Sequence, residues 1–268
     1  MLSNQKKNIC FLLIFFVTGF IFEFAELWAD EDYALKLYHK GISAKTVSKR
    51  EQFIEKALEA YLGQFYVLKK KGQINGLLCY NIGNCYFNLD QIGNAVYYYK
   101  LAQTLLPTNE KIRDNLKIAL QQNKNTVFYS RDGVITALLF FHYYLSPARR
   151  INILIVFSIV SAFLLILFQY YDKNIIKYMS IISCSIALVL FISIGFGYYM
   201  PDHLGVFTCD ADVRKDAGLG FAPITTKPLG AGSVVRVLSL NKKWYKIKLN
   251  DGQEGHVRQK NLKLIIRY

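Results

Sequence analysis

The stretch GLLCYNIGNCYFNLDQIGNAVYYYKLAQTLLPTN, residues 76–109, decides how this chain is organised. It places small residues where two helices would approach closely, and aromatic residues that would fill the space between the helices: Gly83, Ala95 and Ala102, and Tyr86 and Tyr99. Pro107 follows and cannot continue a helix. The stretch therefore predicts a helix–turn–helix unit that ends near Pro107.

The order of these residues resembles the tetratricopeptide repeat, a unit of about 34 residues. The aliphatic, Gly and Tyr positions of its first helix fall on Ile82, Gly83 and Tyr86, and its later Ala, aromatic and Pro positions are filled by Ala95, Tyr99, Ala102 and Pro107. A degenerate earlier copy is expected before it. There Ala57 and Tyr61 would take the parts of Ala95 and Tyr99, with the turn lengthened around 43–49.

Helices are expected on both sides of this repeat, which gives a repeat domain over 30–126. In the first half, apolar residues recur at helical spacing in two groups: Tyr33, Leu37 and Tyr38, then Phe53, Ala57, Leu58 and Tyr61. Lysines 69–71 and Gly72 are typical of a helix C-terminus. A capping helix over 108–122 would begin at Thr108 as N-cap and would cover the last apolar face with Ile112, Leu116, Ala119 and Leu120.

The apolar share of 53% exceeds the globular average and indicates membrane segments. Residues 1–29 have two lysines before an apolar run, as in an export signal, and an uncleaved anchor is the alternative. The stretches 151–171 and 178–200 each reach the spanning length of roughly 20 residues. The six residues 172–177 between them predict a hairpin, and 134–147 predicts a helix lying in the interface. If the signal segment leads export, the domains on both sides of the hairpin face away from the cytoplasm.

Residues 204–268 predict a small β domain with alternating apolar and polar residues around Trp244 and Tyr245. This segment holds twelve Lys and Arg against five Asp and Glu, so it would favour an anionic surface or polymer, or carry a solvated lysine-rich face. It resembles a bacterial SH3-like domain, with Trp244, Tyr245, Gly252 and Gly255 as structural positions. His256 departs from that resemblance, because the family usually carries Trp there.

Taken together, the predicted fold class is a multidomain membrane protein. It combines an all-α tetratricopeptide repeat, a two-helix transmembrane hairpin and a small all-β SH3-like barrel. The order of signal, repeat, hairpin and SH3-like domain resembles BatE-type proteins of bacterial aerotolerance operons. That resemblance implies a multi-pass protein of the bacterial inner membrane that acts as a scaffold, with both soluble domains facing the periplasm. It also implies partners among Bat-type proteins with von Willebrand A domains, and a link to oxidative or envelope stress.

Binding is the activity that the residues favour. A tetratricopeptide groove is lined by the first helix of each repeat, and the positions that match it are Leu77, Tyr80, Asn84, Phe87 and Asn88. The amide of Asn84 both donates and accepts, so it is a candidate for a peptide backbone or carboxylate, or it serves only the fold. Cell-wall polymer is a second candidate ligand, through the basic C-terminal domain.

Catalysis is not expected. No catalytic motif, metal-ligand spacing or cofactor fingerprint stands in the sequence, and the exported basic domain lacks the aromatic platform of a nucleic-acid binder. The acidic residues Asp210, Asp212 and Asp216 fit solvated turn positions. Among five cysteines, Cys209 lies outside the predicted signal, repeat core and membrane, which leaves a redox sensor as a third hypothesis.

Overall fold

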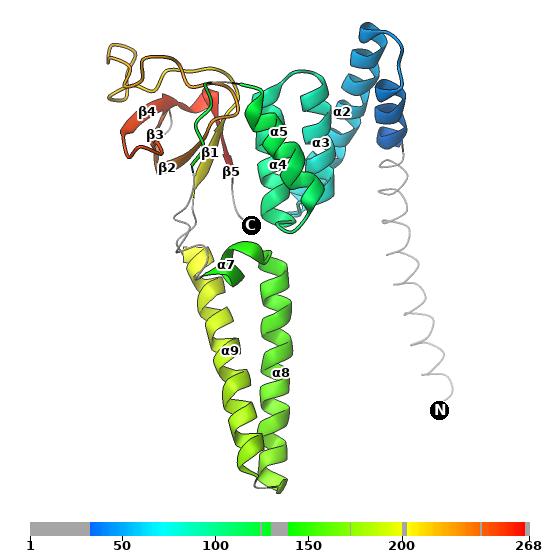
Figure 1. Ribbon diagram of the computed structural model, residues 1–268, viewed down its shortest axis with the longest axis vertical. Helices are drawn as coiled ribbons and strands as arrows, with labels where there is room; N and C mark the ends of the chain where they lie inside the picture. Colours follow the sequence, from blue (N-terminus) through cyan, green and yellow to red (C-terminus); the bar gives the residue numbers. More distant parts are fainter. Residues whose placement is uncertain are drawn as a thin grey trace, which may run out of the picture. The chain divides into compact units, whose positions relative to one another are not determined.

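The computed structural model of the chain describes residues 33–123, 125–129, 139–171, 173–199, 203–241 and 243–265 (Figure 1). Helices come first, two long apolar helices follow, and a five-stranded antiparallel sheet ends the chain, which confirms the predicted order of parts. The chain divides into two compact units, 1–91 and 92–268. The two helices of the predicted repeat therefore belong to different units. The predicted export signal at 1–29 and the first part of the predicted interfacial helix lie outside the described residues.

The first unit contains a helix over 33–42, α2 (Val47–Lys70) and α3 (Gly76–Asn88). Thr46 caps α2, so this helix begins inside the predicted turn 43–49. Asn75 caps α3 by accepting from the N–H groups of Leu77 and Leu78 at 2.9 and 3.2 Å. As predicted, α2 ends in lysines followed by a glycine, and Gly72 has a φ of 71°, a left-handed conformation that suits glycine.

The core of this unit is built mainly from residues at helical spacing, several of them fully buried: Ala34, Ile54, Ala57, Cys79, Ile82 and Cys85. Tyr61 and Leu37 are also buried. The predicted shared face of Tyr33, Leu37 and Tyr38 was wrong for Tyr33, which is 59% exposed. Ala34 takes the buried place instead, because the buried stripe of this helix recurs at positions 34, 37 and 41.

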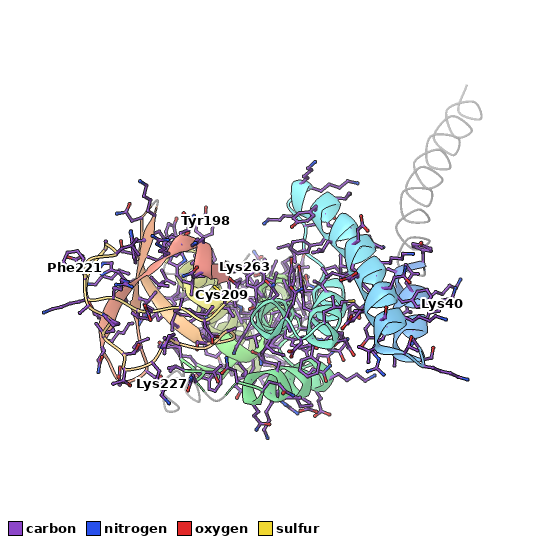
Figure 2. All side chains as sticks on the ribbon, turned by 90° about the horizontal axis from the view of Figure 1, so that it is seen from above. Lys40, Tyr198, Cys209, Phe221, Lys227 and Lys263 are labelled. Carbon is purple, nitrogen blue, oxygen red and sulfur yellow. The ribbon has the colours of Figure 1, made fainter. Side chains whose placement is uncertain are left out.

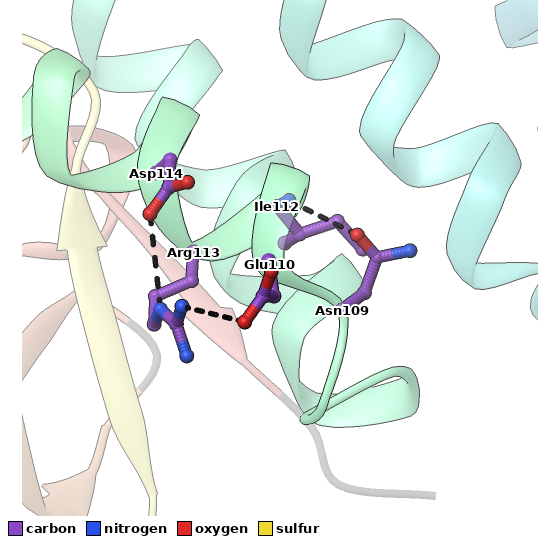
Figure 3. Close-up of polar contacts among 5 residues, drawn as sticks. All are labelled: Asn109, Glu110, Ile112, Arg113 and Asp114. Carbon is purple, nitrogen blue, oxygen red and sulfur yellow. Dashed lines mark hydrogen bonds and ion pairs between the residues drawn. The ribbon is translucent and has the colours of Figure 1, made fainter.

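The second unit begins with α4 (Ile92–Leu105) and α5 (Glu110–Gln121). Ala95 and Ala102 are fully buried and Tyr99 is nearly so, and α4 ends two residues before Pro107, as predicted. The predicted N-cap Thr108 was wrong. Asn109 caps α5 with its Oδ1, which accepts from the N–H of Ile112 at 3.3 Å (Figure 3).

Two long apolar helices follow, α8 (Pro147–Tyr171) and α9 (Asn174–Tyr199), and both are long and apolar enough to span a membrane. They run side by side (Figure 1). Their contact carries serine hydrogen bonds: Ser183 Oγ donates to the carbonyl of Phe157 at 2.9 Å, and Ser161 and Ser180 each donate to the other's carbonyl at about 3.4–3.5 Å. Small residues and hydroxyls at a helix contact are typical of membrane hairpins. Both helices begin about four residues earlier than predicted, so only Asp172 and Lys173 separate them.

The β domain has five short strands: β1 (Leu204–Phe207), β2 (Val234–Leu240), β3 (Trp244–Lys248), β4 (Glu254–Arg258) and β5 (Leu262–Ile265). Their order in the sheet is β4-β3-β2-β1-β5, and every neighbouring pair is antiparallel. Alternate residues of β3 and β4 point inward, and the buried core is apolar: Phe207, Val213, Val235, Val237, Tyr245, Ile247, Val257 and Leu262. A one-turn 3-10 helix, Gln259–Asn261, precedes β5.

The β domain packs on α4. Gly93 of α4 lies so close to the end of β1 that a Cβ there would stand 2.6 Å from the carbonyl oxygens of Phe207 and Thr208. The segment after α5 also joins the sheet: Val127 and Tyr129 exchange two hydrogen bonds of 2.8 Å with Val234, beside the start of β2. The helices α4 and α5 and the sheet therefore share one packed region.

Candidate binding surfaces

The predicted groove residues lie along one helix, α3. Leu77 is 50% exposed, and the other four positions, Tyr80, Asn84, Phe87 and Asn88, are half-buried. Tyr80, Asn84 and Asn88 follow one another at four-residue spacing, so they line one face of α3. Asn88 donates from Nδ2 to the carbonyl of Asn84 at 2.9 Å and to the Tyr38 hydroxyl at 3.3 Å. The face thus continues from α3 onto the helix over 33–42.

Tyr38 is a residue of this surface that sequence reasoning assigned to packing. Burial raises the pKa of Tyr38 to about 12, with smaller raising effects from Cys85 and Tyr80, while the hydrogen bond from Asn88 acts in the opposite direction. The phenol is therefore neutral at physiological pH, and its hydroxyl accepts from Asn88 while keeping a proton to donate. Fifty positions separate Tyr38 from Asn88, so no local sequence pattern pairs them.

A second surface is the outer face of β3 and β4. Trp244, Lys246 and Lys248 point outward from β3, and Arg258 of β4 lies over the Trp244 ring at 5.8 Å. Lys246 forms an ion pair of 2.7 Å with Glu254, whose pKa is lowered chiefly by that hydrogen bond. The face is predominantly cationic and carries the rings of Trp244 and His256, so its charge suits an anionic ligand.

A long loop, 208–233, covers the far edge of β4. Arg214 exchanges backbone hydrogen bonds of 2.9 and 2.7 Å with His256, and its guanidinium donates to the carbonyls of Leu219 and Phe221 at 2.8 and 2.7 Å. Gly255 allows this contact, because a Cβ there would stand 2.6 Å from Val213 Cγ1. The predicted structural role of Gly255 thus has a geometric reason.

The three acidic residues of this loop have separate structural contacts. Asp210 accepts from the N–H of Ala231 at 2.7 Å, Asp212 forms an ion pair with Arg214 at 3.2 Å, and Asp216 accepts from the N–H of Ala217 at 2.6 Å. Within the described residues, no group of three or more His, Cys, Asp or Glu is arranged to hold a metal ion.

A cation links β5 to α4. Lys263 Nζ donates to Asn94 Oδ1 at 2.8 Å and lies 5.3 Å and 5.7 Å from the rings of Tyr97 and Tyr98. Burial nevertheless lowers the pKa of Lys263, so desolvation of the ammonium outweighs these contacts. Figure 2 labels Lys263 and the exposed Cys209.

The short helix α7 (Phe140–Tyr144) brings a buried polar cluster to one end of the hairpin. Arg150 donates to Nδ1 of His142 at 2.9 Å and to the hydroxyl of Ser193 at 3.0 Å. A guanidinium only donates, so Nδ1 of His142 accepts and the ring proton lies on Nε2. The periodicity of 134–147 gave no sign that His142 contacts α9.

The cysteines fall into two environments. Cys79 and Cys85 are buried, and burial raises the pKa of each thiol to about 12, while Cys184 and Cys209 are exposed. Exposure makes Cys209 reachable, as the redox hypothesis requires, but within the described residues no second cysteine is arranged to pair with it.

No known protein family and no curated protein matches the chain.

Proposed function

We propose that this protein is a membrane-anchored scaffold whose helical face captures a partner protein outside the cytoplasm. The observation that carries the proposal is the row of polar and aromatic side chains on α3, extended by Tyr38 through its hydrogen bond from Asn88. Amide and phenol groups offer both donors and acceptors to a peptide main chain. Beside them, Leu77 presents an exposed apolar side chain that a partner would cover.

The anchoring part of the proposal rests on α8 and α9. Their length and composition fit a membrane span, and serine hydrogen bonds join them. Export by residues 1–29 would place the helical face and the β domain on the outer side of the inner membrane. On the resemblance to BatE-type proteins, the partners are sibling Bat-type proteins with von Willebrand A domains.

A crosslinking experiment tests the helical face directly. A photoreactive phenylalanine analogue replaces Tyr80 in the full-length membrane protein, and irradiated membranes are probed for adducts with the sibling Bat-type proteins. The matched control places the same analogue at Tyr66, which is 55% exposed on α2. Adducts at Tyr80 that disappear in the Asn84→Ala variant are expected. Equal adducts at Tyr66 and Tyr80, or adducts that persist in Asn84→Ala, would refute capture by this face.

The second candidate function is binding of cell-wall polymer by the β domain, which we propose to be an SH3-like barrel. Support comes from the antiparallel order β4-β3-β2-β1-β5, the long loop between β1 and β2, and the 3-10 helix before β5. Its outer face offers Lys246, Lys248 and Arg258 to an anionic chain. Sedimentation of the detergent-solubilised full chain with peptidoglycan, across a salt series, tests it, and no sedimentation at low salt would end this reading.

A further inference from the structure

The tip of the β2–β3 hairpin exposes apolar side chains. The pairing register of β2 and β3 shifts between Val237 and Ser239, which leaves Leu238 as the extra residue of a β-bulge. From the bulge onward, buried and exposed residues no longer alternate along β2, and the side chains of Leu238 and Leu240 are 40% and 51% exposed. Two leucines therefore face solvent at the end of a strand whose earlier part is buried.

Cations and an indole follow these leucines in the sequence. The turn reads Asn241-Lys242-Lys243 in the sequence, Lys243 is exposed, and Trp244 begins β3 with Arg258 over its ring. Leu240 pairs with Tyr245, so Leu240 and Trp244 lie on opposite faces of the hairpin end. Leucine, tryptophan and lysine are typical of segments that enter the interface of an anionic membrane. We call Leu238–Asn241, Lys243 and Trp244 the hairpin tip.

The register of the sheet places the hairpin tip at the end of the sheet where the chain enters β1. Strand β1 runs antiparallel to β2, and before β1 the carbonyl of His203 still accepts from the N–H of Val237 at 2.7 Å. From Val237 the strand continues three residues to Leu240, roughly 10 Å at 3.3 Å per residue. This continuation points toward the end of the sheet at which the chain arrives from α9.

The connection from α9 is equally short. Only residues 200–202 separate Tyr199, the last residue of α9, from His203, a span of at most about 14 Å between those two Cα atoms. Tyr198 and Tyr199 are 78% and 82% exposed, as aromatic residues at a membrane interface are. A tip that extends roughly 10 Å past Val237, on a domain tethered within about 14 Å of Tyr199, is able to reach the level of these tyrosines.

We propose that the hairpin tip inserts into the headgroup layer of the membrane that α8 and α9 span, and that Lys243 contacts anionic phospholipid phosphates. Leu238 and Leu240 enter the apolar boundary, and Trp244 lies at headgroup depth. This inference rests on the proposed membrane anchoring. A tether of a few residues keeps the tip at high effective concentration beside its lipids. The contact fixes the β domain against the membrane surface.

Tryptophan fluorescence tests the proposal in the full-length chain. Tryptophan occurs only at positions 28 and 244, so Trp28→Phe leaves Trp244 as the single reporter. The protein is reconstituted into vesicles of phosphatidylcholine alone or of phosphatidylcholine with phosphatidylglycerol, each with or without acyl-brominated lipid. We expect a blue-shifted emission and quenching by brominated lipid in the anionic vesicles. Leu240→Asp should lose both effects, whereas Leu219→Asp, which alters a leucine 61% exposed in the 208–233 loop, should keep them.

Each alternative outcome is decisive. Flotation with the vesicles reports the anchoring separately: a chain that does not float refutes both the anchoring and the tip contact. A chain that floats while Trp244 stays unquenched, or responds only to added wall polymer, refutes the tip contact alone. Equal quenching in both lipid mixtures overturns the role of anionic phosphates.

Discussion

Replacement of Gly93 by alanine should loosen the β domain from α4. The new Cβ would stand 2.6 Å from the carbonyl oxygens of Phe207 and Thr208, and these are backbone atoms that cannot rotate away. Overpacking of this kind costs about 1–3 kcal/mol, and alanine returns up to about 1 kcal/mol of helix propensity. Taking the middle of both ranges, the expected net loss is about 1.5 kcal/mol in the free energy of local opening, a factor of roughly 10 in the opening equilibrium.

Hydrogen exchange of the full-length protein in detergent measures this loss where it arises, because local opening is read peptide by peptide. Peptides covering β1 and α4 should lose protection in Gly93→Ala. The control is Gly63→Ala, also within a helix, where nothing stands within 4 Å of the added Cβ. That substitution should gain up to about 1 kcal/mol in α2. Unchanged or greater protection of β1 in Gly93→Ala would refute the close approach of helix and strand.

Three further predictions concern single side chains. Asn109→Ala should cost about 1 kcal/mol in the opening of α5, whereas Thr108→Ala should cost little, and hydrogen exchange of that helix distinguishes the two. In the native protein near neutral pH, a maleimide should label the exposed Cys209 and not Cys79, because the Cys79 thiol has a pKa of about 12 and almost no thiolate is present. Mass spectrometry identifies the labelled sites, and native labelling of Cys79 would contradict its burial. Burial lowers the pKa of Lys263, so the folded state binds fewer protons than the unfolded state between that lowered pKa and the ordinary 10.5. Stability of the β domain, followed by denaturation at a series of pH values, should therefore rise with pH across this interval, and the rise should shrink in Lys263→Met.

Helix ends could be predicted from the sequence wherever a single residue suited the role for a clear physical reason. Pro107 ended α4 because it cannot continue a helix, and Gly72 ended α2 in a left-handed conformation. The patterns failed where two neighbours suited one role. Thr108 and Asn109 are both good caps, and only the structure selects Asn109. Pro147 marked an end in the sequence reading, yet it begins α8, because proline is favoured in the first turn of a helix.

The candidate surfaces were predictable only in part. The spacing of Tyr80, Asn84 and Asn88 placed them on one helical face, but Tyr38 joins them through a contact between separate helices. The packing of α4 on the sheet could not be predicted from the sequence either. Gly93 reads as an ordinary helical glycine in the sequence, and Lys263 and Asn94 are 169 positions apart. Contacts of such separation leave no periodic signal, because periodicity reports only neighbours along one element.

The packing of α4 on the sheet changes how the wall-binding alternative must be examined. In the sequence, residues 204–268 look like a separable module. In the structure, Val127 and Tyr129 pair with Val234 at the start of β2, and α4 covers the end of β1 at Gly93. A fragment that starts at 204 would leave those backbone groups unpaired and that apolar surface open, and exposed strand edges promote association. Binding or its absence in such a fragment would report on a different surface. The polymer assay therefore requires a chain that retains 92–129, and the charge of the β3–β4 face can be judged only there.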